Sequence, residues 1–554
     1  MPYLPGRLTT PSRIAVAALL WTAGLCGCAD GERPPRLVLL LVVDQLRADR
    51  LDPALPGGLG RLAREGRWYV DAVVGHAHTE TCPGHVAAAS GRHPGPVGVP
   101  GNQYVDARSG KLVYCVEDEA PDARVHGASH GRSPRAIAAT ALGDWLEQAD
   151  PRTRVFSVSA KDRSAIGMGG QHPDAAYWLE RQEARGFTTS AYYRPDLPAW
   201  VRSFNGEGGA AGFLAGLPPT WEHPTGSPPN GARPDAYAGE IGQLSGTSPH
   251  PLAGGDASVT LEQLFVSPFL DDVTLDFART LVENEDLGRG EQADLLALSL
   301  SATDLVGHYY GPESQEARDA LVRLDAALGR FLSFLERRVG RGRLLVALTS
   351  DHGVLPLPEW LEETGRGTCP VRGGRVDPRG LGAALESILD ATFGADTAGK
   401  GPWLHHADYR VTVSRERAQA AGVTPQQVVE RAQEMLEAQP VVERVWTAEE
   451  ITAGSGPEPF ATLYRNSHHP ERGGDLVVQP RRDCLIAGYA GTSHGTPYLD
   501  DSAIPLVFFG PGVQPGRVRG RAGLVDLAPS VAAHLGLALP LGLDGRALNL
   551  NGEG

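Results

Sequence analysis

Leu37-Val-Leu-Leu-Leu-Val-Val43 ends at Asp44, and this stretch is the clearest indication of the fold. Seven consecutive apolar residues, rich in branched side chains, are typical of a strand covered on both faces, as in a parallel sheet. Similar runs recur along the chain, at Val155–Ala160 before Lys161, Leu295–Leu300 before Asp304, Leu344–Leu348 before Asp351 and Pro505–Phe509 before Gly510. Because ligands of open α/β sheets bind outside the carboxyl ends of the strands, we expect the functional site there.

Helices are expected between these runs. The clearest covers roughly residues 313–338, where apolar residues recur at helical spacing and predict a helix lying on the sheet: Leu321, Leu324, Leu328, Phe331, Leu332 and Leu335. The sequence predicts a doubly wound α/β domain over residues 37–554, with a mostly parallel sheet, helices on both faces and a large insertion around 165–290. Within it, residues 204–257 are rich in Gly, Pro, Asn and Ser, which indicates an irregular lid or rim.

The composition excludes several classes of protein. The chain has 554 residues, of which 41% are hydrophobic and 21% charged, so it can bury a large core and is neither a disordered tail nor a coiled coil. Its 51 Lys and Arg residues against 66 Asp and Glu residues give a net charge of −15, with no long basic run. We therefore expect no nucleic-acid binding, because phosphate contacts need a basic face. A small anionic substrate remains compatible if the site supplies its own cations.

The first residues resemble an export signal. Ile14–Leu25 is a twelve-residue apolar segment preceded by Arg7 and Arg13, too short to span a bilayer but suited to the centre of a secretory signal. Leu25-Cys-Gly-Cys28 resembles a bacterial lipobox, so we expect residues 1–27 to be removed, Cys28 to be lipidated and residues 28–36 to form a tether. Ordinary secretion is the alternative. Either reading predicts a periplasmic or extracellular protein. With the lipobox, we expect membrane contact through an N-terminal lipid only.

Four cysteines remain in the mature chain, widely spaced and without a CxxC motif, so a thiolate metal site is not expected. They are Cys82, Cys115, Cys369 and Cys484. The compartment permits disulfides, and the three fully paired connectivities stay open.

Six side chains of the metal-ligand type follow apolar runs or lie in glycine-rich loops: Asp44, Asp304, His308, Asp351, His352 and His494. Asp304 and His308 are four residues apart, which puts them on one face if the segment is helical. Mixed carboxylate and imidazole ligands suit zinc, and two such sets suit a two-metal site. Any one of these motifs alone is more often a surface turn or a cap.

Thr81 lies in Thr79-Glu-Thr81-Cys-Pro-Gly-His85, just before an apparent helix at Val86–Ser90. A hydroxyl at a turn into a helix meets free backbone N–H groups, which favour a phosphate. Coordination to zinc would favour the alkoxide of Thr81, making it a nucleophile. The simpler alternative is that Thr81 only caps the helix.

Taken in order along the chain, these motifs resemble the alkaline phosphatase superfamily, and more narrowly its secreted, phosphate-irrepressible members with a threonine nucleophile. The likeness runs from Leu37 to the end, including Asp526–Ser530 and Asp544-Gly-Arg546. The resemblance implies two Zn²⁺ ions, one held by Asp44, Thr81, Asp351 and His352 and the other by Asp304, His308 and His494. The first would activate Thr81, giving a phosphothreonine, and the second would stabilise the departing alkoxide.

The resemblance also implies that Asn102, Lys161 and Arg163 contact the nonbridging phosphate oxygens. A monoester dianion carries more charge there than a diester, so Lys161 and Arg163 favour monoesters. The formylglycine signature of sulfatases is absent because Cys82 is followed directly by Pro83. Cys82 beside the nucleophile, and Tyr104 where relatives often carry a Trp-Tyr pair, depart from the family pattern.

We therefore predict a zinc-dependent alkaline phosphatase that hydrolyses small phosphate monoesters through a phosphothreonine intermediate, releases inorganic phosphate and is more often a monomer than an oligomer. A phosphodiesterase or nucleotide pyrophosphatase of the same superfamily is the first alternative. A noncatalytic surface lipoprotein that retained the fold is the second.

Overall fold

A computed structural model describes residues 34–183, 185–206, 211–223, 232–242, 244–252, 255–340, 342–396, 399–488 and 490–552. The expected signal peptide, Cys28 and most of the expected tether lie outside these residues. No helix within the described ranges has both the length and the apolar character needed to cross a membrane.

A nine-stranded sheet forms the centre of the molecule, in the order β20-β2-β19-β12-β1-β11-β6-β7-β8. β1 (Leu37–Val43) lies between β11 (Asp294–Leu300) and β12 (Leu344–Thr349), parallel to both, and all seven of its residues are buried. The remaining strands are β2 (Arg67–Tyr69), β6 (Val155–Ser159), β7 (Ala175–Glu180), β8 (Gly186–Thr188), β19 (Leu506–Phe509) and β20 (Gly516–Val518). The mostly parallel α/β sheet expected from the apolar runs is confirmed.

One run was interpreted wrongly. β19 pairs antiparallel with both β12 and β2, so Gly510 after it lies at the edge opposite to Asp44. An apolar run records that a strand is covered on both faces, and this pattern does not depend on the direction of the strand.

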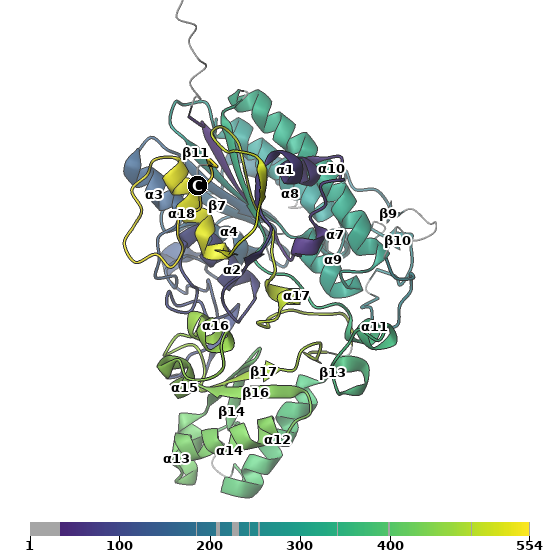
Figure 1. Ribbon diagram of the computed structural model, residues 1–554, viewed down its shortest axis with the longest axis vertical. Coiled ribbons are helices and arrows are strands. Elements are labelled where there is room, and N and C mark those ends of the chain that lie inside the picture. The colour runs from purple at the N-terminus through teal and green to yellow at the C-terminus, as the bar shows by residue number, and fades with distance from the viewer. Residues whose placement is uncertain are drawn as a thin grey trace, which may run out of the picture.

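Helices cover both faces of the sheet (Figure 1). Alternate residues of β1 point into the two resulting cores. One face carries α1 (Gly58–Glu65), α7 (Ala257–Phe265), α8 (Phe269–Asn284), α9 (Ala302–Tyr310) and α10 (Gln315–Val339). The other carries α2 (Thr81–Ser90), α3 (Leu142–Ala149), α4 (Asp162–Gly169) and α18 (Leu527–His534).

Two of these helices test the sequence analysis directly. α10 confirms the helix expected over 313–338; five residues of its apolar stripe are buried, and Leu321 packs partly buried against the same core. α2 begins at Thr81 and not at Val86. Pro83 does not prevent this, because a proline within the first turn of a helix removes an N–H that has no helical partner.

A second, antiparallel sheet lies between β12 and β19 in sequence and was not anticipated. Its strand order is β14-β15-β17-β16, and Figure 1 shows it as a separate lobe beyond the carboxyl edge of the central sheet. The lobe consists of β14 (Leu404–Ala407), β15 (Arg410–Val413), β16 (Val442–Thr447), β17 (Leu476–Pro480), α12 (Pro378–Phe393), α13 (Arg415–Ala421), α14 (Pro425–Glu437), α15 (Ala448–Ala453) and α16 (Phe460–Ser467). It has its own apolar core and a disulfide, Cys369–Cys484.

Shorter elements connect these layers. They are β3 (Ala72–Val73) with β21 (Ala522–Gly523), β4 (Gln103–Val105) with β5 (Leu112–Tyr114), β9 (Thr220–Trp221) with β10 (His250–Pro251), β13 (Arg375–Val376) with β18 (Leu485–Ile486), and α5 (Ala199–Asn205), α6 (Ala211–Leu214), α11 (Pro358–Glu363) and α17 (Leu499–Ser502). The region around 165–290 thus contains β7 and β8 of the central sheet as well as α5 to α8. Between α6 and α7 the described residues form only β9, β10 and loops.

Candidate active site

The carboxyl ends of four neighbouring parallel strands bring the expected site residues to one edge of the sheet. Asp44 follows β1, Asp351 lies two residues after β12, Lys161 lies two residues after β6, and Asp304 lies in α9 just after β11. Asp44 and Asp351 are fully buried, and Asp304 and Lys161 nearly so. The expectation that polar groups gather beyond the strand ends is confirmed.

The first group of ligand-type side chains is Asp44, Asp351 and His352, whose ligand atoms all lie within 4.8 Å of one another. His352 Nε2 lies 3.2 Å from Asp351 Oδ2 and 3.6 Å from Asp44 Oδ1, and none of these three atoms has a hydrogen-bond partner among the described residues. His352 Nδ1 lies 3.0 Å from the Gly353 carbonyl, which can only accept. Burial lowers the pKa of His352, so its ring is neutral and the Nε2 lone pair faces two carboxylates.

The second group is Asp304, His308 and His494. Asp304 and His308 lie on one face of α9, with His308 Nε2 3.2 Å from Asp304 Oδ1, as their spacing predicted. His494 Nε2 lies 3.2 Å from His308 Nε2 and 3.6 Å from Asp304. The Nδ1 atoms of the two rings lie 2.7 and 2.6 Å from the Thr492 and Thr79 carbonyls, so both rings direct Nε2 inward.

Both groups fit a bound divalent cation. Metal-ligating histidines characteristically donate the other ring N–H to a carbonyl or carboxylate, and His308, His352 and His494 all donate Nδ1–H to backbone carbonyls. Two Nε2 atoms at 3.2 Å, with a carboxylate beside them, are stabilised either by a proton on one ring or by a cation between them. The groups adjoin, since the rings of His352 and His494 stack at 3.6 Å.

Lys161 supplies positive charge between the two groups. Its Nζ lies 2.6 Å from Asp44 Oδ2 and 2.5 Å from Asp304 Oδ2. Burial raises the pKa of Asp44 well above its usual range, and repulsion from Asp304 and Asp351 adds to the shift. Burial also opposes ionisation of Asp304, but Lys161, His308 and His494 together outweigh it and hold the pKa of Asp304 well below its usual range.

Thr81 is the first residue of α2 and is buried. The residue before the helix is Glu80, so the alternative that Thr81 is the N-cap is wrong. Arg163 Nη2 lies 3.5 Å from Thr81 Oγ1. Gly84 allows the first turn of α2 to lie against Asp351, because a Cβ on Gly84 would come within 2.6 Å of the Asp351 Cβ.

Hydrogen bonds hold Arg163 from behind. Arg163 Nη1 donates to the Tyr114 hydroxyl at 3.3 Å, and that hydroxyl donates to Asp162 Oδ1 at 2.5 Å. Arg132 Nε donates to the other oxygen of Asp162 at 2.7 Å. Tyr114 and Arg132 were missed by the sequence analysis, and no motif in the sequence marks them.

Asn102 is held between two cysteines. The Cys82 amide donates to Asn102 Oδ1 at 2.8 Å, and the Cys115 amide donates to its carbonyl at 3.0 Å. Cys82 and Cys115 form a disulfide, which joins the first turn of α2 to the residue after β5. With Cys369–Cys484, this is one of the three pairings that the sequence left open.

The second lobe also reaches the site, through Arg410 at the start of β15. Arg410 is buried and donates at 3.0 Å to Glu80 Oε1, while Glu80 Oε2 accepts the Asn102 amide at 2.7 Å. Burial raises the pKa of Glu80 to about 7, although Arg410 opposes the shift. A Cβ on Gly101 would lie 1.9 Å from Arg410 Nη2, so only glycine leaves room for the guanidinium.

Gln45 is another residue that the sequence analysis missed. Its Nε2 donates to Asp304 Oδ1 at 2.7 Å and its backbone amide donates to Asp351 Oδ1 at 3.1 Å, so it links the two ligand groups. Gln45 has a φ of 67°, a left-handed conformation uncommon for this residue type and worth attention beside a site. Its position directly after Asp44 was the available signal.

Comparison with known proteins gives a consistent result. Residues 38–500 match the family model described as type I phosphodiesterase/nucleotide pyrophosphatase. The chain is 29% identical to alkaline phosphatase PafA of Elizabethkingia meningoseptica, covering 98% of this chain and 99% of that one. It is 32% identical to alkaline phosphatase PhoK of a Sphingomonas species, covering 93% and 91%.

Solved structures give the same match. The crystal structure of PafA superimposes with a TM-score of 0.84 at 28% identity, covering 93% of this chain and 98% of PafA. A solved PafA variant carries replacements of a threonine, an asparagine, a lysine and an arginine. The first two are 21 residues apart and the last two are two residues apart, which are the separations of Thr81 from Asn102 and of Lys161 from Arg163.

Proposed function

The chain belongs to the type I phosphodiesterase/nucleotide pyrophosphatase family of the alkaline phosphatase superfamily and is a phosphoric monoester hydrolase, and from this we propose that it is a two-zinc enzyme with Thr81 as its nucleophile. The substrates would be small phosphate monoesters and the product inorganic phosphate. The single observation that carries the proposal is that six carboxylate and imidazole side chains gather in two adjoining groups beside the first turn of α2, with His352 near both.

The donor set fits zinc, which prefers nitrogen and oxygen ligands in tetrahedral sites with an open position. Asp44, Asp351 and His352 would hold one ion together with Thr81, and Asp304, His308 and His494 would hold the other. When bound, zinc supplies Lewis acidity, which lowers the pKa of coordinated hydroxyls and stabilises oxygens that develop negative charge.

The chain's own residues supply the nucleophile and hold the phosphoryl group. Thr81 Oγ1 would attack phosphorus in line with the leaving oxygen, forming a phosphothreonine that water then hydrolyses. Its position at the start of α2 would place the phosphoryl group at the positive end of the helix dipole. The side-chain amide of Asn102, the Lys161 ammonium and the Arg163 guanidinium would donate to the nonbridging oxygens.

A preference for monoesters rests on Lys161 and Arg163. Both are cations on the short segment after β6, and a monoester dianion carries more negative charge on its nonbridging oxygens than a diester. The matching threonine, asparagine, lysine and arginine spacing in PafA, an alkaline phosphatase, supports this assignment. The description of the family model as phosphodiesterase keeps diester hydrolysis as the alternative.

Replacement of Thr81 tests the nucleophile. We expect Thr81→Ala to lower kcat for an aryl monoester by roughly a thousandfold or more, and Thr81→Ser to retain much of the activity because it keeps the hydroxyl. Radiolabelled substrate quenched in acid should leave phosphate on the wild type and on Thr81→Ser only. An unaltered rate in Thr81→Ala, at unchanged zinc content, would refute the assignment.

The ratio of aryl monoester to aryl diester hydrolysis, measured on one purified preparation, tests the substrate class. We expect kcat/KM to be larger for the monoester. A strong preference for the diester would transfer the chain to the phosphodiesterase alternative.

We also propose that the enzyme works outside the cytoplasm, attached through a lipid on Cys28. The two disulfides support an oxidising compartment. Mass spectrometry of the mature N-terminus tests this, and a terminus without lipid would leave ordinary secretion.

A further inference from the structure

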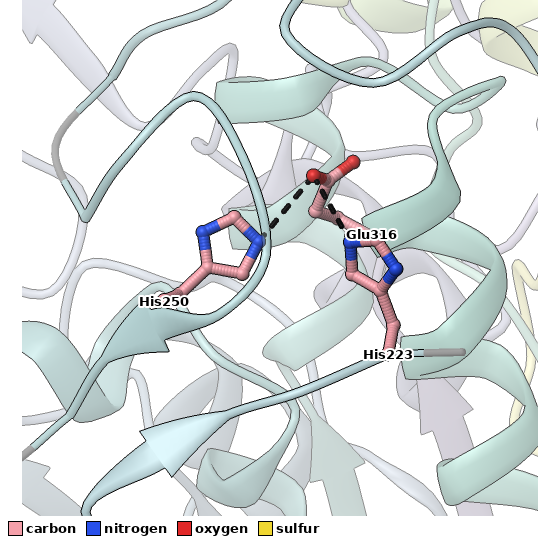
Figure 2. Close-up of side chains that lie close together, drawn as sticks. All are labelled: His223, His250 and Glu316. Carbon is pink, nitrogen blue, oxygen red and sulfur yellow. Dashed lines mark ion pairs between the residues drawn. The ribbon is translucent and has the colours of Figure 1, made fainter. Parts of the chain in front are cut away.

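We propose that His223, His250 and Glu316 form a third metal site, separate from the active site, that takes zinc. Figure 2 shows the three side chains converging from segments far apart in sequence. His223 lies two residues after β9, His250 begins β10, and Glu316 lies in the first turn of α10. The ligand atoms of His223, His250 and Glu316 lie within 4.8 Å of one another, and none of the six proposed active-site ligands belongs to this group.

The group is buried and lacks ordinary partners. His250 and Glu316 are fully buried and His223 is 5% exposed. Five of their polar atoms lack a hydrogen-bond partner within the described part of the chain: both oxygens of Glu316, both nitrogens of His223 and Nε2 of His250. No described lysine or arginine forms an ion pair with Glu316. A buried carboxylate without a donor is costly, so the arrangement requires a positive charge, either from protonation of the imidazoles or from a bound cation.

A hydrogen bond with Ser245 determines which nitrogen of a neutral His250 ring carries the proton. Ser245 Oγ donates to the Thr247 carbonyl at 2.6 Å, so it accepts from His250 Nδ1, which lies 2.9 Å away. In the neutral ring this leaves the lone pair of His250 Nε2 directed at Glu316. A histidine whose outer nitrogen donates to an oxygen while the inner one faces a carboxylate is the arrangement found in metal sites.

The distances agree with ligands that share one ion. His250 Nε2 lies 3.4 Å and His223 Nε2 3.5 Å from the same oxygen, Glu316 Oε1. A direct charge-assisted hydrogen bond would be shorter, about 2.7–2.9 Å. Two atoms each about 2.1 Å from a tetrahedral zinc ion lie about 3.4 Å apart, which matches both separations.

The metal has a route from solvent and room for a fourth ligand. His223 lines a cleft of about 320 Å³ together with Gln45, Thr303, Gln315 and Arg318. Asp235 Oδ2 lies 4.0 Å from His223 Nε2. Water from the cleft or the Asp235 carboxylate can complete the coordination. Two imidazoles and a carboxylate favour zinc over calcium or magnesium, which prefer oxygen ligands.

The site would fasten the loop region before α7 to the metal-bearing helix of the active site. Tyr310, the last residue of α9, packs against the His250 ring with centroids 5.4 Å apart. Its carbonyl accepts from Arg233, which also pairs with Glu240. The same helix carries Asp304 and His308.

Zinc content measured on the full chain tests the proposal. Purified protein is saturated with zinc, desalted and analysed by inductively coupled plasma mass spectrometry. We expect three zinc ions per chain in the wild type and in the control His172→Ala, whose side chain is exposed. We expect one ion fewer in His250→Ala and in Glu316→Gln. If both variants retain the wild-type number of zinc ions, the proposal is wrong and the group is a buried pairing of imidazolium with carboxylate.

A milder variant guards against loss of the fold. Ser245→Ala removes the acceptor of His250 Nδ1–H together with the hydrogen bond from Ser245 to the Thr247 carbonyl, and keeps all three ligands. We expect it to weaken binding of the third zinc ion by roughly ten- to a hundredfold in a competition titration with a chromogenic chelator. The third site would be refuted if the wild type holds only two zinc ions and Ser245→Ala gives the same zinc-binding curve as the wild type. His308→Ala separates this result from the proposed function, because it should lose an active-site ion and keep the third.

Discussion

In the proposed function, Lys161 is the residue on which substrate choice depends most directly. Its ammonium lies between Asp44 and Asp304, at the junction of the two ligand groups and two residues from Arg163. It is not one of the six proposed metal ligands, so its removal should alter recognition of the phosphoryl group more than metal binding.

We predict that Lys161→Ala lowers kcat/KM for an aryl monoester by on the order of a hundredfold, and for an aryl diester by much less, because the lost interaction involves a full charge on the dianion. Steady-state kinetics with matched substrates measures the difference. Lys400→Ala, which removes a partly exposed lysine of the second lobe, is the control and should leave both rates unchanged. Equal losses for the two substrates would contradict the role.

The sequence indicates the candidate metal-ligand residues because each carries a local signal. Asp44 and Asp351 follow apolar strands, and Asp304 and His308 have the spacing of one helical face. Arg410 carries no such signal. It contacts Glu80 across 330 residues of sequence, and the sheet that carries it was itself not anticipated. Contacts of this kind follow from tertiary packing, which periodicity does not encode.

At the scale of elements, the disulfide Cys82–Cys115 determines how firmly α2 and the β4–β5 hairpin are joined. Asn102 donates to Glu80 and accepts from the amides of both cysteines, so its position depends on that junction. Loss of the covalent link frees the hairpin without removing any group that touches substrate.

We predict that the double variant Cys82→Ser/Cys115→Ser raises KM for monoesters several-fold and lowers stability by about 4 kcal/mol, the loop-entropy value for a separation of 33 residues. The double variant Cys369→Ser/Cys484→Ser is the matched control. It should lower stability by about 5 kcal/mol, for a separation of 115 residues, and leave KM unchanged. Urea unfolding and initial rates measure both quantities. A larger rise in KM for Cys369→Ser/Cys484→Ser than for Cys82→Ser/Cys115→Ser would contradict the link to Asn102.

Asp271 in α8 controls how α9 meets the sheet. Its Oδ1 accepts the Ala302 amide at the start of α9 at 3.0 Å, and its other oxygen has no hydrogen-bond partner within the described residues. Burial raises the pKa of Asp271 to about 7 from an ordinary value of 3.8. The folded state therefore holds a proton that the unfolded state loses near pH 4.

We predict that this group's contribution to stability is fully present below about pH 4 and is lost as the pH rises toward about 7, amounting to at most about 4 kcal/mol. Asp271→Asn keeps the acceptor oxygen and removes the titration. The difference in unfolding free energy between wild type and variant, measured from pH 4 to pH 8, should therefore shift in favour of the variant as the pH rises. A difference that does not vary with pH would show that Asp271 titrates normally.

The sequence determines the type of these elements better than their direction or their first residue. β1 and α10 match expectation because a buried parallel strand and an amphipathic helix each have a distinctive periodicity. β19 has the same apolar pattern in the opposite direction, and α2 is buried along its whole length, so no amphipathic stripe marks where it begins.

At the scale of the whole molecule, the sites concentrate negative charge inside the fold. Asp44, Asp304 and Asp351 are buried together, and the single ammonium among the described residues that pairs with any of them is that of Lys161, which contacts Asp44 and Asp304. Bound divalent cations should therefore stabilise the folded state against the unfolded chain.

We predict that removing metal with a chelator lowers the thermal unfolding midpoint by several degrees and that added zinc restores it. Differential scanning calorimetry in metal-free buffer measures the change. Asn102→Ala, which retains every ligand, should respond as the wild type does, so the effect is independent of turnover. An identical midpoint with and without chelator would argue against tightly held metal.

The single-domain expectation for residues 37–554 accounts for the central sheet and its helices but not for the antiparallel lobe. The lobe's strands are four to six residues long, and their alternation is weak in sequence. Such segments do not predict a sheet from the sequence, because their pairing depends on strands that are distant in the chain.

The contact of Arg410 with Glu80 has a consequence for recombination between relatives. The Arg410 guanidinium of the second lobe passes over Gly101 and contacts the carboxylate of Glu80, the residue before Thr81, on the other lobe. Grafting residues 358–486 from a homologue would replace the Arg410 side of this ion pair alone. The recipient would still need a carboxylate at the position of Glu80 and a glycine at the position of Gly101. The two lobes must be inherited together as a compatible pair.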